Sequence, residues 1–281
     1  MSASGKVLAT PLQQLATKGI AEFNQLPESD RKPPVLGASS WDAHGRPSAP
    51  PAGYLAARVY IRALLRDEKG ELRRDEVQSK KYFGPNRDFF WLSESEWRSL
   101  VPANPREGQK FAVPEAVARR IILFHLLDAT TSIANRPWPP EQRRSADLTL
   151  TVEAVSAAAI RLRLDGKVRL ADHADFAQAQ RRGDFRLMGA LNYDVAAKAF
   201  DRFDVVALAD DYLNAHISEY LQQVGQKNRF ALGIAFELAR PGSLGYGTPP
   251  ATVRDADRGQ LLGYFGTDKD PAVLRYFGKE K

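Results

Sequence analysis

Between residues 147 and 240 the sequence alternates apolar and polar residues in one segment after another. Successive side chains of a β-strand point to opposite faces of the sheet, so a period of two predicts strands with one buried face. We therefore expect half-buried antiparallel strands. The segments with this pattern are 147–153, 159–170, 185–194, 200–208 and 230–238, and two earlier strand candidates are 57–65 and 88–92.

The pair Asp165-Gly166 lies inside the second of these segments and is typical of a hairpin turn. A two-residue loop there would place apolar side chains opposite charged ones. A three-residue or bulged loop pairs Leu164 with Val168 and keeps the apolar side chains together. Because faces must match where one face is buried, we expect a bulged turn at this position.

The segment 230–238 has large residues on one face and small residues on the other. The large face carries phenylalanine, leucine and isoleucine, whereas the small face carries Ala231, Gly233 and Ala235, followed by Glu237. Small residues in a strand let another part of the structure approach closely. A packed helix is the neighbour that we expect, and the floor of a ligand site is the alternative.

Three helices are expected near this sheet. Ser93 and Glu96 have the spacing of a capping box, which starts a short helix. Pro114 opens a stronger helix to about Asp128, with an apolar stripe that can cover the sheet, and a third helical pattern occupies 210–223. The fold class that these patterns predict is α+β. We expect a curved antiparallel sheet of about six strands, a meander or half-barrel, packed on one or two helices, with a smaller N-terminal αβ layer.

The chain is expected to have four parts in sequence order. They differ in proline content, in hydrophobic period and in glycine content. The parts are an N-terminal helix with a proline-rich arm (1–52), an αβ layer with helices near 93–100 and 114–128 (53–146), the antiparallel sheet (147–240), and a C-terminal segment rich in glycine and aromatic residues (241–281).

Composition excludes several classes of protein. The 281 residues include no cysteine, so disulfides, cysteine-ligated metals and thiol nucleophiles are absent. No window approaches the roughly 20 apolar residues of a membrane-spanning helix, and we expect no signal peptide within the sequence. The net charge is +6, with basic doublets scattered along the chain rather than run together. Nucleic acid is therefore not an expected partner.

Four residues could form a metal site if the fold brought them together. His125 and Asp128 lie near the end of the expected helix, and His173 and Asp175 lie in a polar loop. Two imidazoles and two carboxylates make an N₂O₂ set that suits zinc or manganese. The structural alternative is a buried His125 that donates to Asp128 or to a carbonyl. No His-Glu-x-x-His, Gly-x-Ser-x-Gly or Walker-type motif occurs, so we assign no catalytic residue, and a divalent metal is the one cofactor that we consider.

A second polar cluster lies on the segment 200–208. Arg202 and Asp204 share one face of the expected strand, where Arg186 or Tyr193 could pair with them across the hairpin. Charged groups in an otherwise apolar sheet need partners, because burial of a lone charge is unfavourable. The cluster is either an ion pair on an exposed face or a polar patch that lines a cup and recognises a ligand. In the second case the binding residues are Arg186, Tyr193, Arg202 and Asp204, together with Ala231, Gly233 and Ala235.

Several short segments between about residues 85 and 240 have a residue pattern in common with a known set of proteins. They are VPEAVARR (113–120), FHL (124–126), LTLTV (148–152), RLRLDG (161–166), LMGALNYD (187–194), FDVVA (203–207) and GIAFEL (233–238). With these segments the chain resembles uncharacterised exported proteins of planctomycete-type bacteria. The resemblance implies an extracytoplasmic setting, periplasmic or secreted, and it implies no catalytic residues.

These observations favour a function other than catalysis. We expect an exported binding or interaction protein that uses the concave face of the sheet or its rim, with a small molecule or another protein as its partner. The first alternative is a metal-dependent hydrolase built on His125, Asp128, His173 and Asp175. The second alternative is a binder of acidic polymers that acts through the basic surface of the protein.

Overall fold

A computed structural model describes residues 50–64, 66–72, 86–129, 136–214 and 230–243, together with the single residues 25, 27, 246, 248, 250, 251 and 264. The chain divides into two units, Met1–Asp42 and Ala43–Lys281, and the second unit is the one described below. The helix and arm expected at 1–52 fall almost wholly outside the described residues, as does most of the segment 241–281.

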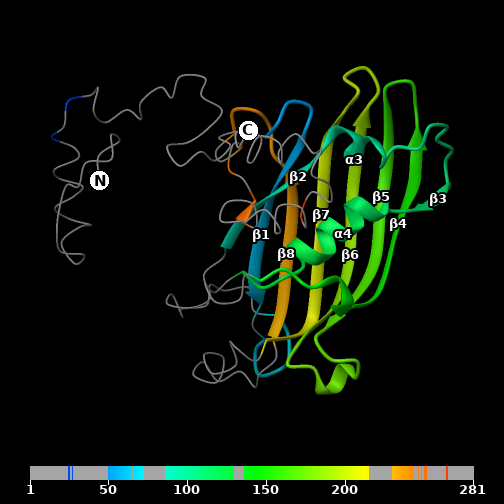
Figure 1. The fold of residues 1–281 in the computed structure, drawn as a ribbon. Helices are drawn as coiled ribbons and strands as arrows, with labels where there is room; N and C mark the ends of the chain where they lie inside the picture. Colours follow the sequence, from blue (N-terminus) through cyan, green and yellow to red (C-terminus); the bar gives the residue numbers. More distant parts are fainter. Residues whose placement is uncertain are drawn as a thin grey trace, which may run out of the picture. The chain divides into compact units, whose positions relative to one another are not determined.

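In the described part of the chain, the second unit is built on one sheet of eight strands, all paired antiparallel (Figure 1). The spatial order is β2-β1-β8-β7-β6-β5-β4-β3, so β3 to β8 form a meander of sequential neighbours. The α+β class and the antiparallel sheet are confirmed, with eight strands rather than about six. The strands are β1 (Leu55–Leu64), β2 (Asn86–Leu92), β3 (Lys110–Ala112), β4 (Arg143–Val155), β5 (Ala159–Ala171), β6 (Arg181–Asp194), β7 (Ala199–Asn214) and β8 (Phe230–Leu238).

The strands of the segment 53–146 join this same sheet. β1 pairs with β8 and β2 pairs with β1 on one side, while β3 pairs with β4 on the other. A strand at the edge of a sheet leaves backbone N–H and C=O groups unpaired, and β1 supplies the partners for those of β8. The N-terminal αβ layer that we expected is therefore an extension of the main sheet at both of its edges.

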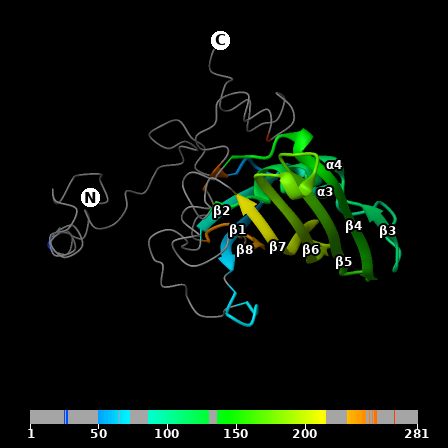
Figure 2. The ribbon, with the colours of Figure 1, turned by 90° about the horizontal axis from the view of Figure 1, so that it is seen from below.

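Within the described ranges 86–129 and 136–214, two α-helices, α3 (Glu94–Arg98) and α4 (Glu115–His125), lie on the same face of the sheet (Figures 1 and 2). The helices expected near 93–100 and 114–128 are thus present, although α4 ends at His125. Two 3₁₀ helices, η1 (Pro140–Gln142) and η2 (Phe176–Gln178), precede β4 and β6.

The capping box predicted for α3 is present. The backbone N–H of Ser93 donates to Glu96 Oε2 at 2.8 Å, so the glutamate side chain satisfies an amide at the start of the helix. A second oxygen of the same carboxylate remains available for another partner. That partner comes from α4, as described below.

The core lies between the two helices and the sheet face that they cover. Val117 and Ile121 of α4 are each 1% exposed, and they face the buried side chains of the strands. The large face of β8 belongs to this core: the ring centroids of Phe236 and Phe90 are 5.5 Å apart. Burial of apolar surface, worth about 25 cal/mol per Å², is the main stabilising contribution of such a core.

The turn predicted at Asp165-Gly166 is wrong, because β5 continues through both residues. Gly166 lies opposite Leu148 of β4, and the chain reverses instead at residues 156–158. The apolar residues between 160 and 170 are all even-numbered, so one continuous strand buries them on the same face. The Leu148 side chain occupies the space where a Cβ of residue 166 would lie, so the glycine permits close packing between two strands.

The helix predicted over 210–223 is wrong at its beginning. β7 extends to Asn214, with Tyr212 buried and paired with Phe230 of β8. A register shift between Ala209 and Tyr212 accommodates Asp210 and Asp211, the first residues of the predicted helix, within the strand. The rest of that segment, 215–223, lies outside the described residues.

Candidate functional site

The end of the sheet where β7 begins and β8 ends holds a cavity of about 450 Å³. Four aromatic residues, Tyr54, Trp97, Phe200 and Tyr246, contribute to its walls, and Arg240 is among its polar lining residues. Ligand pockets in proteins commonly measure about 300–1,000 Å³ and combine apolar walls with a few polar groups. This cavity, called the rim pocket below, has the size and lining of a site for a small organic ligand.

Helix α3 and the residues before β1 hold the aromatic wall in place. The indole Nε1–H of Trp97 donates to the carbonyl oxygen of Gly53 at 2.8 Å. Gly53 has a φ of 81°, and a Cβ there would lie 2.8 Å from a carboxylate oxygen of Glu94. On its other side, Trp97 meets Phe200 edge to face, with ring centroids 6.1 Å apart. These contacts orient the indole, so the pocket wall is formed before a ligand arrives.

A second hollow, of about 380 Å³, adjoins the rim pocket. The two cavities share Asp201, Leu238 and Arg240 as lining residues, and a third hollow of about 350 Å³ also includes Asp201. Asp201 is therefore at the junction of all three. We call the second cavity the charged hollow, because it is also lined by Arg58, Arg202, Asp204 and Glu237.

Two of the predicted binding residues, Arg202 and Asp204, line the charged hollow. Arg202 Nε lies 2.6 Å from Asp204 Oδ2, and both side chains are half-exposed. The proposed pairing across the hairpin is wrong. Arg186 lies further along β6, and Tyr193 packs its ring 5.5 Å from that of Phe200 at the core. The bulge between β6 and β7 at this end shifts the register, which turns Tyr193 away from the charged pair.

The small side of β8 meets a neighbouring strand. Leu64 of β1 comes closest at Gly233, where an added Cβ would lie 3.0 Å from Leu64 Cδ1. Ala231 is paired with the same leucine, and Ala235 lies further along the same strand pair. The close neighbour at Gly233 is thus a side chain of the adjacent strand and not the helix that we expected.

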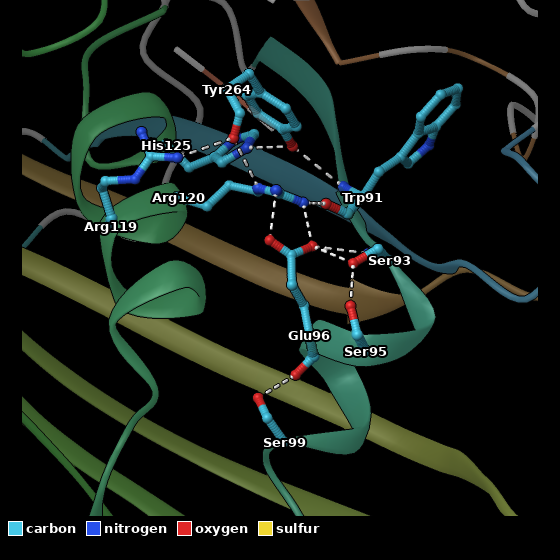
Figure 3. A network of polar contacts seen from close by, with 9 residues as sticks. All are labelled: Trp91, Ser93, Ser95, Glu96, Ser99, Arg119, Arg120, His125 and Tyr264. Atoms are coloured by element: carbon cyan, nitrogen blue, oxygen red, sulfur yellow. Dashed lines mark hydrogen bonds and ion pairs between the residues drawn. The ribbon is translucent and has the colours of Figure 1, made fainter. Parts of the chain in front are cut away.

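A buried network of polar contacts joins α3, α4 and β2 (Figure 3). The guanidinium of Arg120, which is 0% exposed, donates from Nη2 to Glu96 Oε1 at 2.5 Å and from Nη1 to Glu96 Oε2 at 2.7 Å. It also donates to the carbonyl oxygens of Trp91, at 2.6 Å, and Tyr264, at 3.1 Å. Because every one of these acceptors is a protein group, the burial of the Arg120 charge is compensated locally.

The same network covers the outer edge of the sheet. β2 is an edge strand, and its Trp91 turns a backbone N–H and C=O away from β1. The N–H donates to the Tyr264 hydroxyl at 3.2 Å, and the C=O accepts from Arg120. An uncovered edge offers such groups to a strand of another molecule. Two side chains therefore protect this point of the edge.

His125 lies at the centre of this region and is buried. Its Nε2 is 3.2 Å from the Tyr264 hydroxyl, and its Nδ1 is 3.6 Å from Asp88 Oδ2. The Tyr264 oxygen already accepts from Trp91, so its proton is available to Nε2, and we assign the imidazole proton to Nδ1. Burial, followed by the charge of Arg120, lowers the pKa of His125 to about 3, and burial raises the pKa of Tyr264. The neutral, buried pair indicates a structural role.

The structure does not bring the four predicted metal ligands together. α4 ends at His125, so Asp128 does not continue its helical face; the Asp128 backbone N–H donates to the Tyr212 hydroxyl at 3.3 Å. His173 and Asp175 lie in an exposed loop, where the Asp175 side chain caps η2 and the Asp175 backbone N–H donates to His173 Nδ1 at 3.0 Å. Among the described residues, which include all four, no cluster of three His, Asp or Glu side chains could hold a metal ion.

None of the binding residues predicted from the sequence lines the rim pocket. Trp97 lies within the helix predicted near 93–100 and Phe200 begins the strand predicted at 200–208, but no pattern in the sequence places them in contact. Tyr54 and Arg240 lie just outside strands, where period-two patterns end. The sequence does show an aromatic residue or an arginine near the end of each of these elements. It does not show the order of the strands, which brings these ends together in one site.

Comparisons of this chain with protein-family models, with curated protein sequences and with solved structures found no match. Within the ranges that the structure describes, none of the helices is long and apolar enough to cross a membrane. The functional argument therefore depends on the geometry of the chain itself.

Proposed function

We propose that this protein is a binding protein without catalytic activity and that the rim pocket is its ligand site. The observation that carries the proposal is the cavity of about 450 Å³ with four aromatic residues in its walls. An apolar ligand that enters such a cavity leaves water, which is favourable by about 25 cal/mol per Å² of apolar surface. The proposal includes the finer expectation that the sheet is curved like a half-barrel, with the site at its rim.

The arrangement of polar groups near the pocket supports binding over catalysis. Arg202 is paired with Asp204, and the Asp201 carboxylate accepts a hydrogen bond from Asn192 Nδ2 at 2.7 Å. General acid–base catalysis requires a group that is within reach of the substrate and able to exchange a proton near neutral pH. Carboxylates that are already held by an arginine or an amide present oriented hydrogen-bond acceptors to a ligand.

We also propose an extracytoplasmic setting, on the basis of the resemblance to exported planctomycete-type proteins. Fractionation of the producing bacterium, followed by immunodetection of the chain, tests this. Recovery in the periplasm or medium supports the setting, and recovery with a cytoplasmic marker contradicts it.

The binding proposal can be tested with N-phenyl-1-naphthylamine, a neutral apolar dye whose fluorescence rises in apolar surroundings. We expect saturable binding of one dye per chain. Ala199 lines the pocket, so Ala199→Trp should fill the site and weaken binding at least tenfold. Ala196, on the exposed turn before β7, provides the matched control Ala196→Trp, which should bind as the wild type does. Equal binding by both variants would locate the dye elsewhere and refute the rim pocket as the site.

A further inference from the structure

We infer that the ligand of the rim pocket is an organic anion, with an apolar body in the pocket and one acidic group bound by Arg240. The inference rests on the proposed function, since it names the class of ligand for that same site. It follows from the position of Arg240 and from the way in which the neighbouring charges are paired.

Arg240 lies at the boundary between the two cavities. It lines both the rim pocket and the charged hollow, just after the end of β8. Its main chain is held in a turn, because the Ser243 hydroxyl donates to the Arg240 carbonyl oxygen at 2.7 Å and the Ser243 N–H donates to it at 3.0 Å. The guanidinium therefore extends from an anchored backbone beside the apolar cavity.

The other two arginines of the charged hollow already have carboxylate partners. Arg202 Nε lies 2.6 Å from Asp204 Oδ2, and Arg58 Nη2 lies 3.4 Å from Glu237 Oε2. Glu237 also accepts a hydrogen bond from the Tyr60 hydroxyl at 3.0 Å. These two pairs neutralise their own charges, so neither arginine is the group that selects a ligand.

Arg240 has a different kind of partner. Its Nη2 donates to the main-chain oxygen of Asp201 at 3.4 Å, the long end of the hydrogen-bond range. The Asp201 carboxylate is held elsewhere, by Asn192 Nδ2 at 2.7 Å. Of the three arginines that line the two cavities in the described part of the chain, Arg240 is the one without a carboxylate partner.

The chemistry of a guanidinium beside an apolar cavity selects a particular class of molecule. Its planar donors match a carboxylate or a phosphate, and such charge-assisted bonds are stronger than neutral ones. The aromatic walls favour a ligand with an apolar body, which a small inorganic anion lacks. A carboxylic acid and a phosphate monoester with an aromatic body share the required chemistry.

Three probes with one naphthalene body and different head groups test the inference: 2-naphthoate, 2-naphthyl phosphate and 2-naphthalenemethanol. Their dissociation constants are measured by isothermal titration calorimetry with the full chain at pH 7. We expect at least one of the two acids to bind about 10- to 100-fold more tightly than the alcohol, as for one charge-assisted contact. The tighter acid identifies the head group as carboxylate or phosphate.

Two matched variants assign the effect to one side chain. Arg240→Gln should remove the preference for the acid over the alcohol. Arg202→Gln changes another exposed arginine of the same hollow, one that already has a carboxylate partner, so it should keep the preference. Arg240→Lys should restore part of it, because an ammonium retains the charge and loses the planar fork.

The two proposals fail in different ways. If the acids and the alcohol bind wild-type protein equally, or if Arg240→Gln keeps the preference for the acid, the anion inference is wrong while the rim pocket remains a ligand site. If no probe binds, or if Ala199→Trp binds all three probes as the wild type does, the rim pocket itself is not the site.

Discussion

Arg120 and Glu96 form a two-point ion pair inside the protein, with N–O distances of 2.5 and 2.7 Å. The pair joins α4 to α3, and the residue that follows Glu96 is Trp97, which lines the rim pocket. The buried ion pair therefore holds the short helix that carries one wall of the proposed ligand site. Five residues of helix have little stability on their own, so α3 depends on such contacts.

Replacement of Arg120 by methionine should destabilise the fold strongly. The variant leaves the Glu96 carboxylate in a largely buried position without its cation, and loss of one partner of a buried pair costs about 3–5 kcal/mol. Arg143→Gln is the control, because Arg143 pairs with an exposed Glu115 on the same helix and should cost less than about 1 kcal/mol. Urea unfolding measures the free energy of unfolding of both variants. Equal losses would show that the buried ion pair contributes no more to stability than the exposed one.

Replacement of Tyr264 by phenylalanine should weaken the covered edge of the sheet. The hydroxyl accepts from the Trp91 N–H and contacts His125 Nε2, and both would lose their partner. The expected cost is about 1–3 kcal/mol, with faster hydrogen exchange at the Trp91 amide. Tyr60→Phe removes an exposed hydroxyl and should leave that exchange rate unchanged. An unchanged rate in the Tyr264 variant would contradict the edge-covering role.

Stability should fall on acidification because of His125. Its pKa is about 3 in the fold, against 6.5 for an ordinary histidine. Between these values the unfolded chain binds more protons at this residue than the folded chain does, so stability is lost as pH falls from about 6.5 toward 3. The slope from this group is at most about 1.4 kcal/mol per pH unit, and above pH 6.5 it contributes none.

Variants at two histidines separate this effect from the titration of carboxylates. His125→Gln should flatten the dependence of the unfolding free energy on pH between 6.5 and 4, while His173→Gln, in the exposed loop, should retain it. If the two variants show the same pH dependence, His125 is not the group responsible.

Gly166→Ala should destabilise the sheet although alanine is a better strand residue than glycine. A Cβ at this position would clash with the Leu148 side chain of the neighbouring strand. Overpacking of this kind costs about 1–3 kcal/mol. A double-mutant cycle with Leu148→Ala checks the cause, because the two changes should compensate each other when combined. Simple additivity would argue against contact between these residues as the source of the loss.

Much of the sheet could be predicted because apolar and polar residues alternate along each strand, and the apolar residues mark its buried face. The five segments between 147 and 240 all became strands, and the large face of 230–238 is in the core. The error at Asp165-Gly166 came from giving a local turn signal more weight than a period that continues unchanged across it. Burial of a whole face exceeds the turn preference of two residues.

The buried network was harder to predict. Arg119 and Arg120 look like one of several solvated basic doublets, yet Arg120 is fully buried. Its spacing from Val117 and Phe124 places it on the apolar side of the helix, which was an available signal. The rim pocket could not be predicted, since Tyr54, Trp97, Phe200 and Arg240 come from separate elements. They meet only because β8 pairs with both β1 and β7, and a single sequence does not encode that order in any local pattern.

The most direct test of the central claim follows the indole resonance of Trp97 in a ¹H–¹⁵N spectrum while N-phenyl-1-naphthylamine is added. The Trp97 Nε1–H donates to Gly53 in the wall of the rim pocket, whereas the Nε1–H of buried Trp138 donates to the carbonyl oxygen of Leu126, and Trp138 does not line that pocket. Trp97→Phe assigns the signal. If the rim pocket is the ligand site, the Trp97 signal shifts in a saturable way and the Trp138 signal stays in place. A bound dye that leaves the Trp97 signal unmoved would contradict the account.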